Sequence, residues 1–264
     1  MTIDNGLQER FDFGAALIEE AGALAMSYFE RVDSLKVKDK GPQDVVSEAD
    51  VEVENLIRTR LEERFPTDAF FGEESGHGKV ADAEGIWVVD PIDGTQPFVN
   101  GMNSWCVSIG YLREGTPELG FVIAPAQGDL YVGRRGHGAT LNGREIFVSN
   151  ATSLDEGITF VGYSPRITPD DILPVLDRLL RQGGMFIRNG SGTLGLCFVG
   201  CGRILGYVEP HLNSWDAVAA LAIIEAAGGR FNSDFLAGDG LLTGNPIVAG
   251  PPKLYPALAR LLDR

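Results

Sequence analysis

The stretch WVVDPIDGT, residues 87–95, runs from an apolar segment into two aspartates on one short turn. The apolar residues predict a strand that ends at Asp90, because Pro91 interrupts strand pairing and Asp93 opens a turn. Both carboxylates can therefore converge on one point. Two close carboxylates repel each other unless a proton or a cation lies between them, and hard oxygen ligands select Mg²⁺, Mn²⁺ or Ca²⁺. This stretch predicts a divalent-metal site.

The residues next to the aspartates suit an anion and a further acid. Thr95 can open a helix, and the exposed amides of Gly94 and Thr95 at that helix start would suit a phosphate group. The sequence GEES, residues 72–75, follows another short apolar run and could supply Glu73 to the same site. An ordinary surface loop is the alternative interpretation of GEES.

The sequence DVVSEAD, residues 44–50, leads into a predicted helix. Ser47 and Asp50 match a capping box, which alone would account for both residues. Asp50 also precedes the apolar residues Val53 and Ile57 by three and seven positions, so it lies on the inward stripe of the helix. An inward carboxylate needs a metal, a hydrogen-bond donor or a positioned water to offset its burial.

Two later segments add candidate ligands. Asp216 stands near the start of an Ala-rich helix predicted over residues 214–227, which Gly228 and Gly229 close. The helix dipole alone would favour an acid at that start. The glycine-rich loop RNGSG, residues 188–192, precedes another predicted helix and could contact a ligand.

Helical periodicity and short apolar runs alternate along the chain, with no internal repeat. Helices are predicted over residues 11–30, from near Ser47 to Pro66, and over residues 170–181, 193–201, 214–227 and 254–262. Strands are predicted over residues 69–71, 86–89, 106–112, 119–124, 130–132, 158–161, 185–187, 205–208 and 246–249, with a hairpin turn at Asn142-Gly143. The order is not strictly βαβ, which favours layered sheets and helices over a barrel.

Composition and net charge limit the classes of function that the chain can have. The chain has 264 residues, 44% of them hydrophobic, and its 22 Lys and Arg against 37 Asp and Glu give a net charge of −15. Such a surface repels nucleic acids and anionic membranes, but a metal site can still attract an anionic substrate. Cys106, Cys197 and Cys201 form no framework and are expected to be reduced. Without an apolar signal or membrane segment, a soluble cytoplasmic protein is expected.

Together these motifs resemble the inositol monophosphatase family. The resemblance rests on VVDPIDGT, on GEES and DVVSEAD before it, and on WDAVAALAIIEAAGG near the end, and it spans residues 40–229. It implies a layered α-β-α-β-α fold, an α/β sandwich of the sugar-phosphatase type, and a homodimer. It further implies Mg²⁺-dependent, lithium-sensitive hydrolysis of a small phosphate monoester. Residues 1–264 would form one unit, in which 1–150 carries most metal ligands and 151–264 carries Asp216 and the substrate contacts.

The resemblance assigns roles to residues of this chain. It places the metal ligands at Glu73, Asp90, the carbonyl of Ile92, Asp93 and Asp216, for two or three Mg²⁺ ions that Mn²⁺ could replace. It places catalysis at Asp50, Thr95 and Glu73. Asp50 and Thr95 would align the attacking water, and a metal ion held by Glu73 and Asp90 would lower the pKa of that water. It places substrate contacts at Asp93, Gly94, Thr95, Ser191, Gly192, Glu209 and Asp216, with Lys40 in the entry loop.

The alcohol part of the substrate stays open. Myo-inositol monophosphate is the foremost candidate, and histidinol phosphate or a 3′-phosphonucleotide are alternatives within the family. Gln96-Pro97-Phe98 and Leu205 depart from the pattern of the family, which weakens the case for inositol. Fructose 1,6-bisphosphate ranks lower, because the sequence shows only scattered arginines for a second phosphate. A regulatory RNA-binding or protein-binding role is the alternative of another class, although the net charge of −15 argues against direct binding to nucleic acid.

Overall fold

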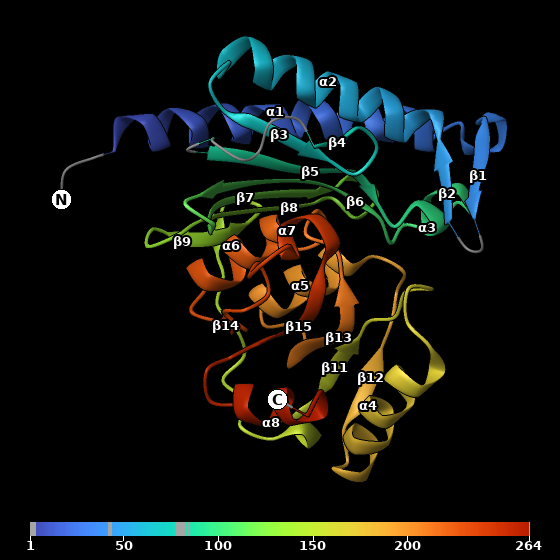
Figure 1. Ribbon diagram of the computed structural model, residues 1–264, viewed down its shortest axis with the longest axis vertical. Coiled ribbons are helices and arrows are strands. Elements are labelled where there is room, and N and C mark those ends of the chain that lie inside the picture. The colour runs from blue at the N-terminus through green and yellow to red at the C-terminus, as the bar shows by residue number, and fades with distance from the viewer. Residues whose placement is uncertain (1–3, 42–43, 78–82, 84, 264) are drawn as a thin grey trace.

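The computed structural model describes residues 4–41, 44–77, 83 and 85–263, and these form five layers (Figure 1). Helices α1 (Asn5–Phe29) and α2 (Glu48–Arg64) cover one face of an eight-stranded sheet. Helices α5 (Gly192–Gly200) and α6 (Val218–Ala226) lie between this sheet and a five-stranded one. Helices α4 (Pro169–Arg181) and α8 (Tyr255–Leu261) cover the outer face of the second sheet. The α-β-α-β-α layering expected from the sequence is confirmed.

The eight-stranded sheet has the order β10-β9-β8-β7-β6-β5-β3-β4. Its strands are β3 (Ala69–Gly72), β4 (Gly76–His77), β5 (Gly85–Asp93), β6 (Cys106–Arg113), β7 (Thr116–Ala124), β8 (Asp129–Arg134), β9 (Gly138–Leu141) and β10 (Arg144–Glu145). Only β3 and β5 pair in parallel. Because β5 is central and nearly continuously buried, the two aspartates at its end lie deep inside the protein.

The five-stranded sheet has the order β12-β11-β13-β15-β14. Its strands are β11 (Ile158–Val161), β12 (Met185–Ile187), β13 (Gly206–Leu212), β14 (Arg230–Phe231) and β15 (Asn245–Gly250). β12 and β13 both run parallel to β11, whereas β15 is antiparallel to β13 and to β14. The carboxyl ends of β12, β11 and β13 therefore meet at one edge of the sheet.

Short elements complete the fold. β1 (Val37–Gly41) and β2 (Asp44–Ser47) form a separate two-stranded sheet. The remaining short helices are α3 (Thr95–Val99), α7 (Gly240–Thr243) and the 3₁₀ turns Val32–Ser34, Pro125–Gln127 and Leu154–Glu156. Within the described ranges, no helix is both long and apolar enough to cross a membrane. The three cysteines are free thiols, as the sequence predicts.

Most predicted elements are confirmed to within a few residues, and the boundaries that differ most are the following. β5 continues to Asp93, past the predicted end at Asp90, because a register shift against β6 between Asp90 and Asp93 accommodates Pro91 within the strand. α1 begins at Asn5 instead of residue 11, because the Asp4 side chain caps it by accepting from the Leu7 amide at 3.1 Å. α6 begins at Val218, so Asp216 lies in the turn before the helix. β13 continues to Leu212, because a register shift against β15 accommodates a proline within the strand.

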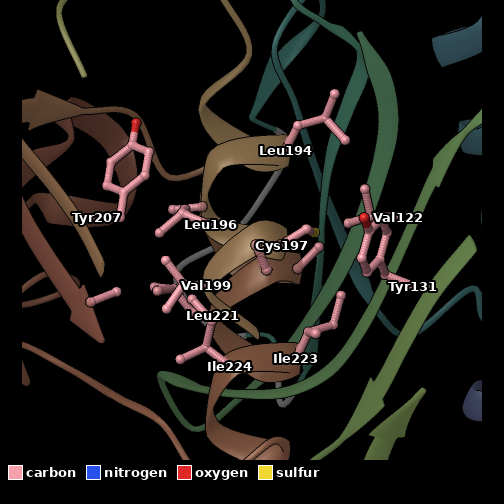
Figure 2. Packing of buried hydrophobic residues seen from close by; sticks show 14 of the residues in the cluster. Val122, Tyr131, Leu194, Leu196, Cys197, Val199, Tyr207, Leu221, Ile223 and Ile224 are labelled. Atoms are coloured by element: carbon pink, nitrogen blue, oxygen red, sulfur yellow. The ribbon is translucent and has the colours of Figure 1, made fainter. Parts of the chain in front are cut away.

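The layer between the sheets is apolar. Figure 2 shows side chains of α5 and α6 between Tyr207 of β13 on one side and Val122 and Tyr131 of the eight-stranded sheet on the other. Leu194 and Ile223 are among the fully buried residues of this layer. Burial on both sides fixes the two helices, and with them the residues at their amino-terminal ends.

A row of three glycines lets α6 approach the eight-stranded sheet closely. Gly120 of β7 pairs with Gly110 of β6 and with Gly133 of β8, so the three lie side by side across the sheet. A Cβ at Gly120 would lie 1.9 Å from the carbonyl oxygen of Ala219, and one at Gly133 would lie 2.6 Å from an α6 Cα. This glycine row therefore determines how closely α6 approaches the eight-stranded sheet, and with it the position of Asp216 just before the helix.

Replacing Gly120 by alanine tests this close approach. The new Cβ would force the sheet and α6 apart, so we expect the free energy of unfolding to fall by about 1–3 kcal/mol, the usual cost of overpacking. Urea denaturation measures the change. The control is Gly6→Ala in α1, where the nearest atom to the new Cβ is 3.4 Å away. Equal stability of the two variants would contradict the role of the glycine row.

Candidate active site

Three carboxylates from distant parts of the chain converge at the end of β5. Asp90, Asp93 and Asp216 each offer an oxygen, and these oxygens lie within 4.8 Å of one another. Asp90 and Asp93 belong to β5, and the turn before α6 supplies Asp216. We call these three residues the acidic cluster. The structure therefore brings together three of the metal ligands that the sequence predicts.

The Asp90 carboxylate is the most isolated anion of the acidic cluster. Its side chain is 1% exposed, and its Oδ1 accepts a hydrogen bond from the Ile92 amide at 3.0 Å. Among the described residues, no donor reaches its Oδ2. Burial, followed by the charges of Glu73, Asp93 and Asp216, raises the Asp90 pKa well above its ordinary value. A buried oxygen without a donor, surrounded by other carboxylates, fits a bound divalent cation.

Asp93 joins the two halves of the site. Its Oδ2 accepts hydrogen bonds from Ser191 Oγ at 2.5 Å and from the Thr193 amide at 2.7 Å, both at the start of α5. Burial raises the Asp93 pKa, and these hydrogen bonds oppose that rise. The next residue, Gly94, has φ of 93°, and a Cβ there would lie 2.8 Å from the Ser104 carbonyl oxygen. Only glycine suits that turn.

Asp216 titrates near neutrality in this arrangement. Burial, followed by the charge of Asp93, raises its pKa to about 7. Its backbone carbonyl accepts a hydrogen bond from Thr193 Oγ1 at 2.7 Å, which ties the turn to α5. Asp216 lies two residues before Val218, the first residue of α6, so it is not in the first helical turn where the sequence placed it.

Asp50 satisfies both of the interpretations that the sequence allowed. Its Oδ2 completes the capping box by accepting from the Ser47 amide at 2.8 Å and from Ser47 Oγ at 2.6 Å. Its Oδ1 accepts from Thr95 Oγ1 at 3.2 Å, so the predicted Asp50–Thr95 pair is formed. Thr95 Oγ1 also lies 3.1 Å from the Ile92 carbonyl oxygen. Burial raises the Asp50 pKa to about 6.

Glu73 lines the same cavity but is not one of the three clustered residues. It follows β3, and its amide donates to the Val89 carbonyl at 3.2 Å. The sequence analysis overlooked Glu54, which holds this segment in place. The buried Glu54 carboxylate accepts from the amides of Glu74 at 2.9 Å and Ser75 at 2.8 Å. Its place one helical turn after Asp50, on the same buried side of α2, was the available signal.

The acidic cluster opens into a cavity of about 620 Å³. Glu73, Gly94 and Thr95 line one side, and Ser191, Gly192 and Glu209 line the other. The cavity is within the usual size range of about 300–1,000 Å³ for small-molecule sites. Its other lining residues include several that the sequence analysis did not single out for binding: Asn100, Met102, Phe160, Tyr163, Ser164, Arg166 and Tyr207. The Lys40 side chain lies outside the described residues.

Glu209 is a buried residue, 3% exposed, among the substrate contacts that the family resemblance implies. It lies inside β13, and its carboxylate accepts a hydrogen bond from the Tyr207 hydroxyl. Burial raises the Glu209 pKa to about 8. Ser191, by contrast, uses its hydroxyl within the protein, because it donates to Asp93 and accepts from the Leu194 amide at 3.1 Å.

Comparison with known proteins agrees with this arrangement. The model of the inositol monophosphatase family matches residues 7–264, and the chain belongs to that family. It is 33% identical over 258 residues to the Nus factor SuhB of Pseudomonas aeruginosa, covering 96% of this chain and 95% of that protein. It is 34% identical over 247 residues to an inositol-1-monophosphatase of Rhizobium meliloti, covering 93% and 92%. The solved inositol monophosphatase of Anabaena superposes with a TM-score of 0.84 and 31% identity, covering 97% and 96%.

The raised pKa of Glu209 predicts a pH-dependent stability. Between its ordinary pKa of 4.5 and about 8, the folded protein keeps the proton that the unfolded chain has lost. The folded state then binds more protons, so this carboxyl lowers the free energy of unfolding as pH rises through that window. Glu209→Gln removes the effect, and we expect the variant to gain stability relative to wild type from pH 5 to pH 8.

Urea denaturation in EDTA at both pH values measures this difference. The matched control is Glu62→Gln on the exposed side of α2, which removes the same atoms from a solvated position. A stability difference between Glu209→Gln and wild type that stays constant from pH 5 to pH 8 would show that burial does not hold the proton on Glu209.

Proposed function

We propose that this chain hydrolyses a small phosphate monoester, with myo-inositol monophosphate as the foremost substrate and Mg²⁺ as the cofactor. The observation that carries the proposal is the buried Asp90 Oδ2, which has no donor among the described residues and faces two further carboxylates. The cavity beside it has room for a phosphate and an attached alcohol. A cation between the carboxylates would also attract the phosphate dianion despite the acidic surface.

The residues present fit a metal-assisted hydrolysis. Asp90, Asp93 and Asp216 would hold Mg²⁺, with Glu73 and the Ile92 carbonyl as further oxygen ligands at the same end of β5. When bound, the metal would supply charge neutralisation at the phosphate and a more acidic water. Phosphoryl transfer depends mainly on positioning and on stabilisation of charge, so no nucleophilic side chain is needed.

Asp50 and Thr95 would position the attacking water. The Thr95 hydroxyl donates its single proton within the protein, either to Asp50 Oδ1 or to the Ile92 carbonyl. Its oxygen can therefore accept a hydrogen bond from a water and orient that water. The Asp50 carboxyl, with a pKa of about 6, is ionised at neutral pH, so it can accept the Thr95 hydrogen bond and leave the Thr95 oxygen free to orient the water.

The alcohol part of the substrate would meet Glu209 and Gly192. The Glu209 carboxyl group can exchange hydrogen bonds with polyol or sugar hydroxyls, and a cationic amine such as that of histidinol phosphate would favour its ionised form. Histidinol phosphate and a 3′-phosphonucleotide therefore stay as alternatives for the same reaction. Comparing kcat/KM across a panel of these esters separates the three, because specificity is a ratio of kcat/KM values.

A second candidate function comes from the relatives that are named Nus factor SuhB. This chain could share a regulatory role in binding RNA or protein, through its surface and independently of the acidic cluster. The net charge of −15 disfavours direct contact with RNA, so a protein partner fits better. An RNA titration beside a phosphate-release assay separates the regulatory role from the enzymatic one.

Three further expectations from the family resemblance stay as proposals. The chain would form a homodimer, which sedimentation velocity measures directly. Lithium would inhibit hydrolysis, which an assay with lithium chloride against a sodium chloride control tests. Residues 1–264 would unfold as one unit, which calorimetry tests by comparing the calorimetric enthalpy with the van't Hoff enthalpy.

Asp90→Asn is the sharpest test of the metal site. It removes one repelling charge and gives the buried position a donor, so in EDTA at pH 7.5 the variant should unfold at a higher temperature than wild type. Millimolar Mg²⁺ should raise the melting temperature of wild type and not that of the variant. Phosphate release from myo-inositol 1-phosphate should fall at least about 100-fold.

The control for Asp90→Asn is Asp33→Asn at an exposed position outside the cavity. It should keep both the activity and the response to Mg²⁺. The proposed function fails if wild type releases no phosphate in Mg²⁺, or if Asp90→Asn keeps more than a tenth of wild-type kcat.

Asp50→Asn separates water positioning from metal binding. The change removes the charge of Asp50 and leaves one acceptor oxygen for the donors of Ser47 and Thr95, without altering the acidic cluster, so kcat should fall by about 10²–10⁴. The rise in melting temperature with Mg²⁺ should match that of wild type. A variant that also loses its response to Mg²⁺ would place Asp50 among the metal-supporting residues, and an unchanged kcat would remove it from the reaction.

A further inference from the structure

Two arginines that are separate in the sequence meet at one edge of the five-stranded sheet. Arg188 directly follows β12, and Arg166 belongs to the loop after β11. These strands are parallel neighbours, so both residues leave the sheet at its carboxyl edge. Ligands of α/β proteins commonly bind at that edge. Arg166 and Arg188 both line the cavity that holds the acidic cluster.

Neither cavity arginine forms an ion pair among the described residues, a feature that they share with arginines outside the cavity such as Arg144 and Arg230. Many of the described arginines form an ion pair with a carboxylate within 4.0 Å: Arg10, Arg60, Arg64, Arg113, Arg135, Arg178, Arg181 and Arg203. Within the described part of the chain, neither cavity arginine pairs with Glu209 or Asp216, although these carboxylates line the same cavity. Their positive charges are available to a ligand.

The structure also fixes the position of one of these side chains. The Arg188 guanidinium donates a hydrogen bond to the Tyr163 carbonyl oxygen at 2.9 Å, which joins the loops that follow β12 and β11. A guanidinium has five N–H donors, so four remain for a ligand. Burial is the main cause of the raised pKa values of Glu209 and Asp216. The positive charge of Arg188 opposes the rise at Glu209, and that of Arg166 opposes the rise at Asp216. Both guanidinium groups therefore lie on the substrate side of the acidic cluster.

We propose that Arg166 and Arg188 bind a second anionic group, carried by the alcohol part of the substrate. This inference rests on the proposed phosphatase function and narrows its substrate class to phosphate monoesters with another phosphate or a carboxylate. A guanidinium matches both groups, because its parallel N–H donors meet two oxygens at once. The reacting phosphate lies at the acidic cluster, and the second anion lies at the carboxyl edge of β11 and β12.

Matched pairs of esters test this subsite. Fructose 1,6-bisphosphate and fructose 1-phosphate differ only in the second phosphate, and 2-phosphoglycerate and glycerol 2-phosphate differ in a carboxylate. We expect wild type to prefer the doubly anionic member of at least one pair by about tenfold to hundredfold in kcat/KM, as lost charge-assisted hydrogen bonds would give. The pair that shows the preference identifies the second group as phosphate or carboxylate.

The double variant Arg166→Gln/Arg188→Gln should abolish that preference, so that the ratio of kcat/KM between the doubly and the singly anionic ester falls to about one. The control is Arg144→Gln/Arg181→Gln, which removes the same charge from exposed positions outside the cavity and should keep the preference. The subsite is refuted if wild type shows no preference in either pair, or if the arginine variant loses activity equally on both members.

A binding measurement separates failure of the subsite from failure of the proposed function. Calorimetric titration of both pairs in Mg²⁺, in the Asp50→Asn background, reports affinity without rapid hydrolysis. Tighter binding of the doubly anionic ester that disappears with the two arginines supports the subsite, even if wild type hydrolyses no ester. Equal affinities within both pairs overturn the subsite, even where hydrolysis is observed.

Discussion

Repulsion among buried carboxylates is the constraint on which this structure depends. Asp90, Asp93 and Asp216 lie within 4.8 Å of one another, and burial raises the pKa of each. Such an arrangement is costly unless protons or cations neutralise it. The fold holds the three together with rigid elements: a central strand, the start of α5, and an α6 helix that the glycine row admits close to the sheet. Cation binding at this cluster would therefore be coupled to the stability of the protein.

The two sheets contribute different groups to the site. The eight-stranded sheet and α2 supply the groups that would hold the metal and the water, including the Asp50–Thr95 pair. The carboxyl edge of the five-stranded sheet supplies the groups that would contact the alcohol, among them Glu209 and the two cavity arginines. The hydrogen bonds from Ser191 and Thr193 to Asp93 connect these two parts. Changes at the second sheet can therefore alter substrate choice without removing a metal ligand.

Local chemistry made much of this predictable from the sequence. The position of β5 and the capping box of Asp50 follow from apolar runs and helix caps, which neighbouring residues determine. The end of β5 was predicted at Asp90, and pairing with β6 carries the strand on to Asp93. Glu54 and Arg166 were not predicted, because contacts between distant segments give them their roles, and Arg188 was indicated only as part of the loop RNGSG. The glycine row could not be predicted either, because its three glycines become neighbours only when β6, β7 and β8 pair in the observed register.

The most direct measurement is the location of bound metal by anomalous diffraction. Crystals of the wild-type protein would be soaked in Mn²⁺ and compared with Asp90→Asn crystals that are treated identically. The account predicts a strong anomalous peak in contact with carboxylate oxygens of Asp90, Asp93 and Asp216 in wild type, and its loss in the variant. Peaks confined to surface carboxylates, in a protein that still releases phosphate with Mn²⁺, would contradict it.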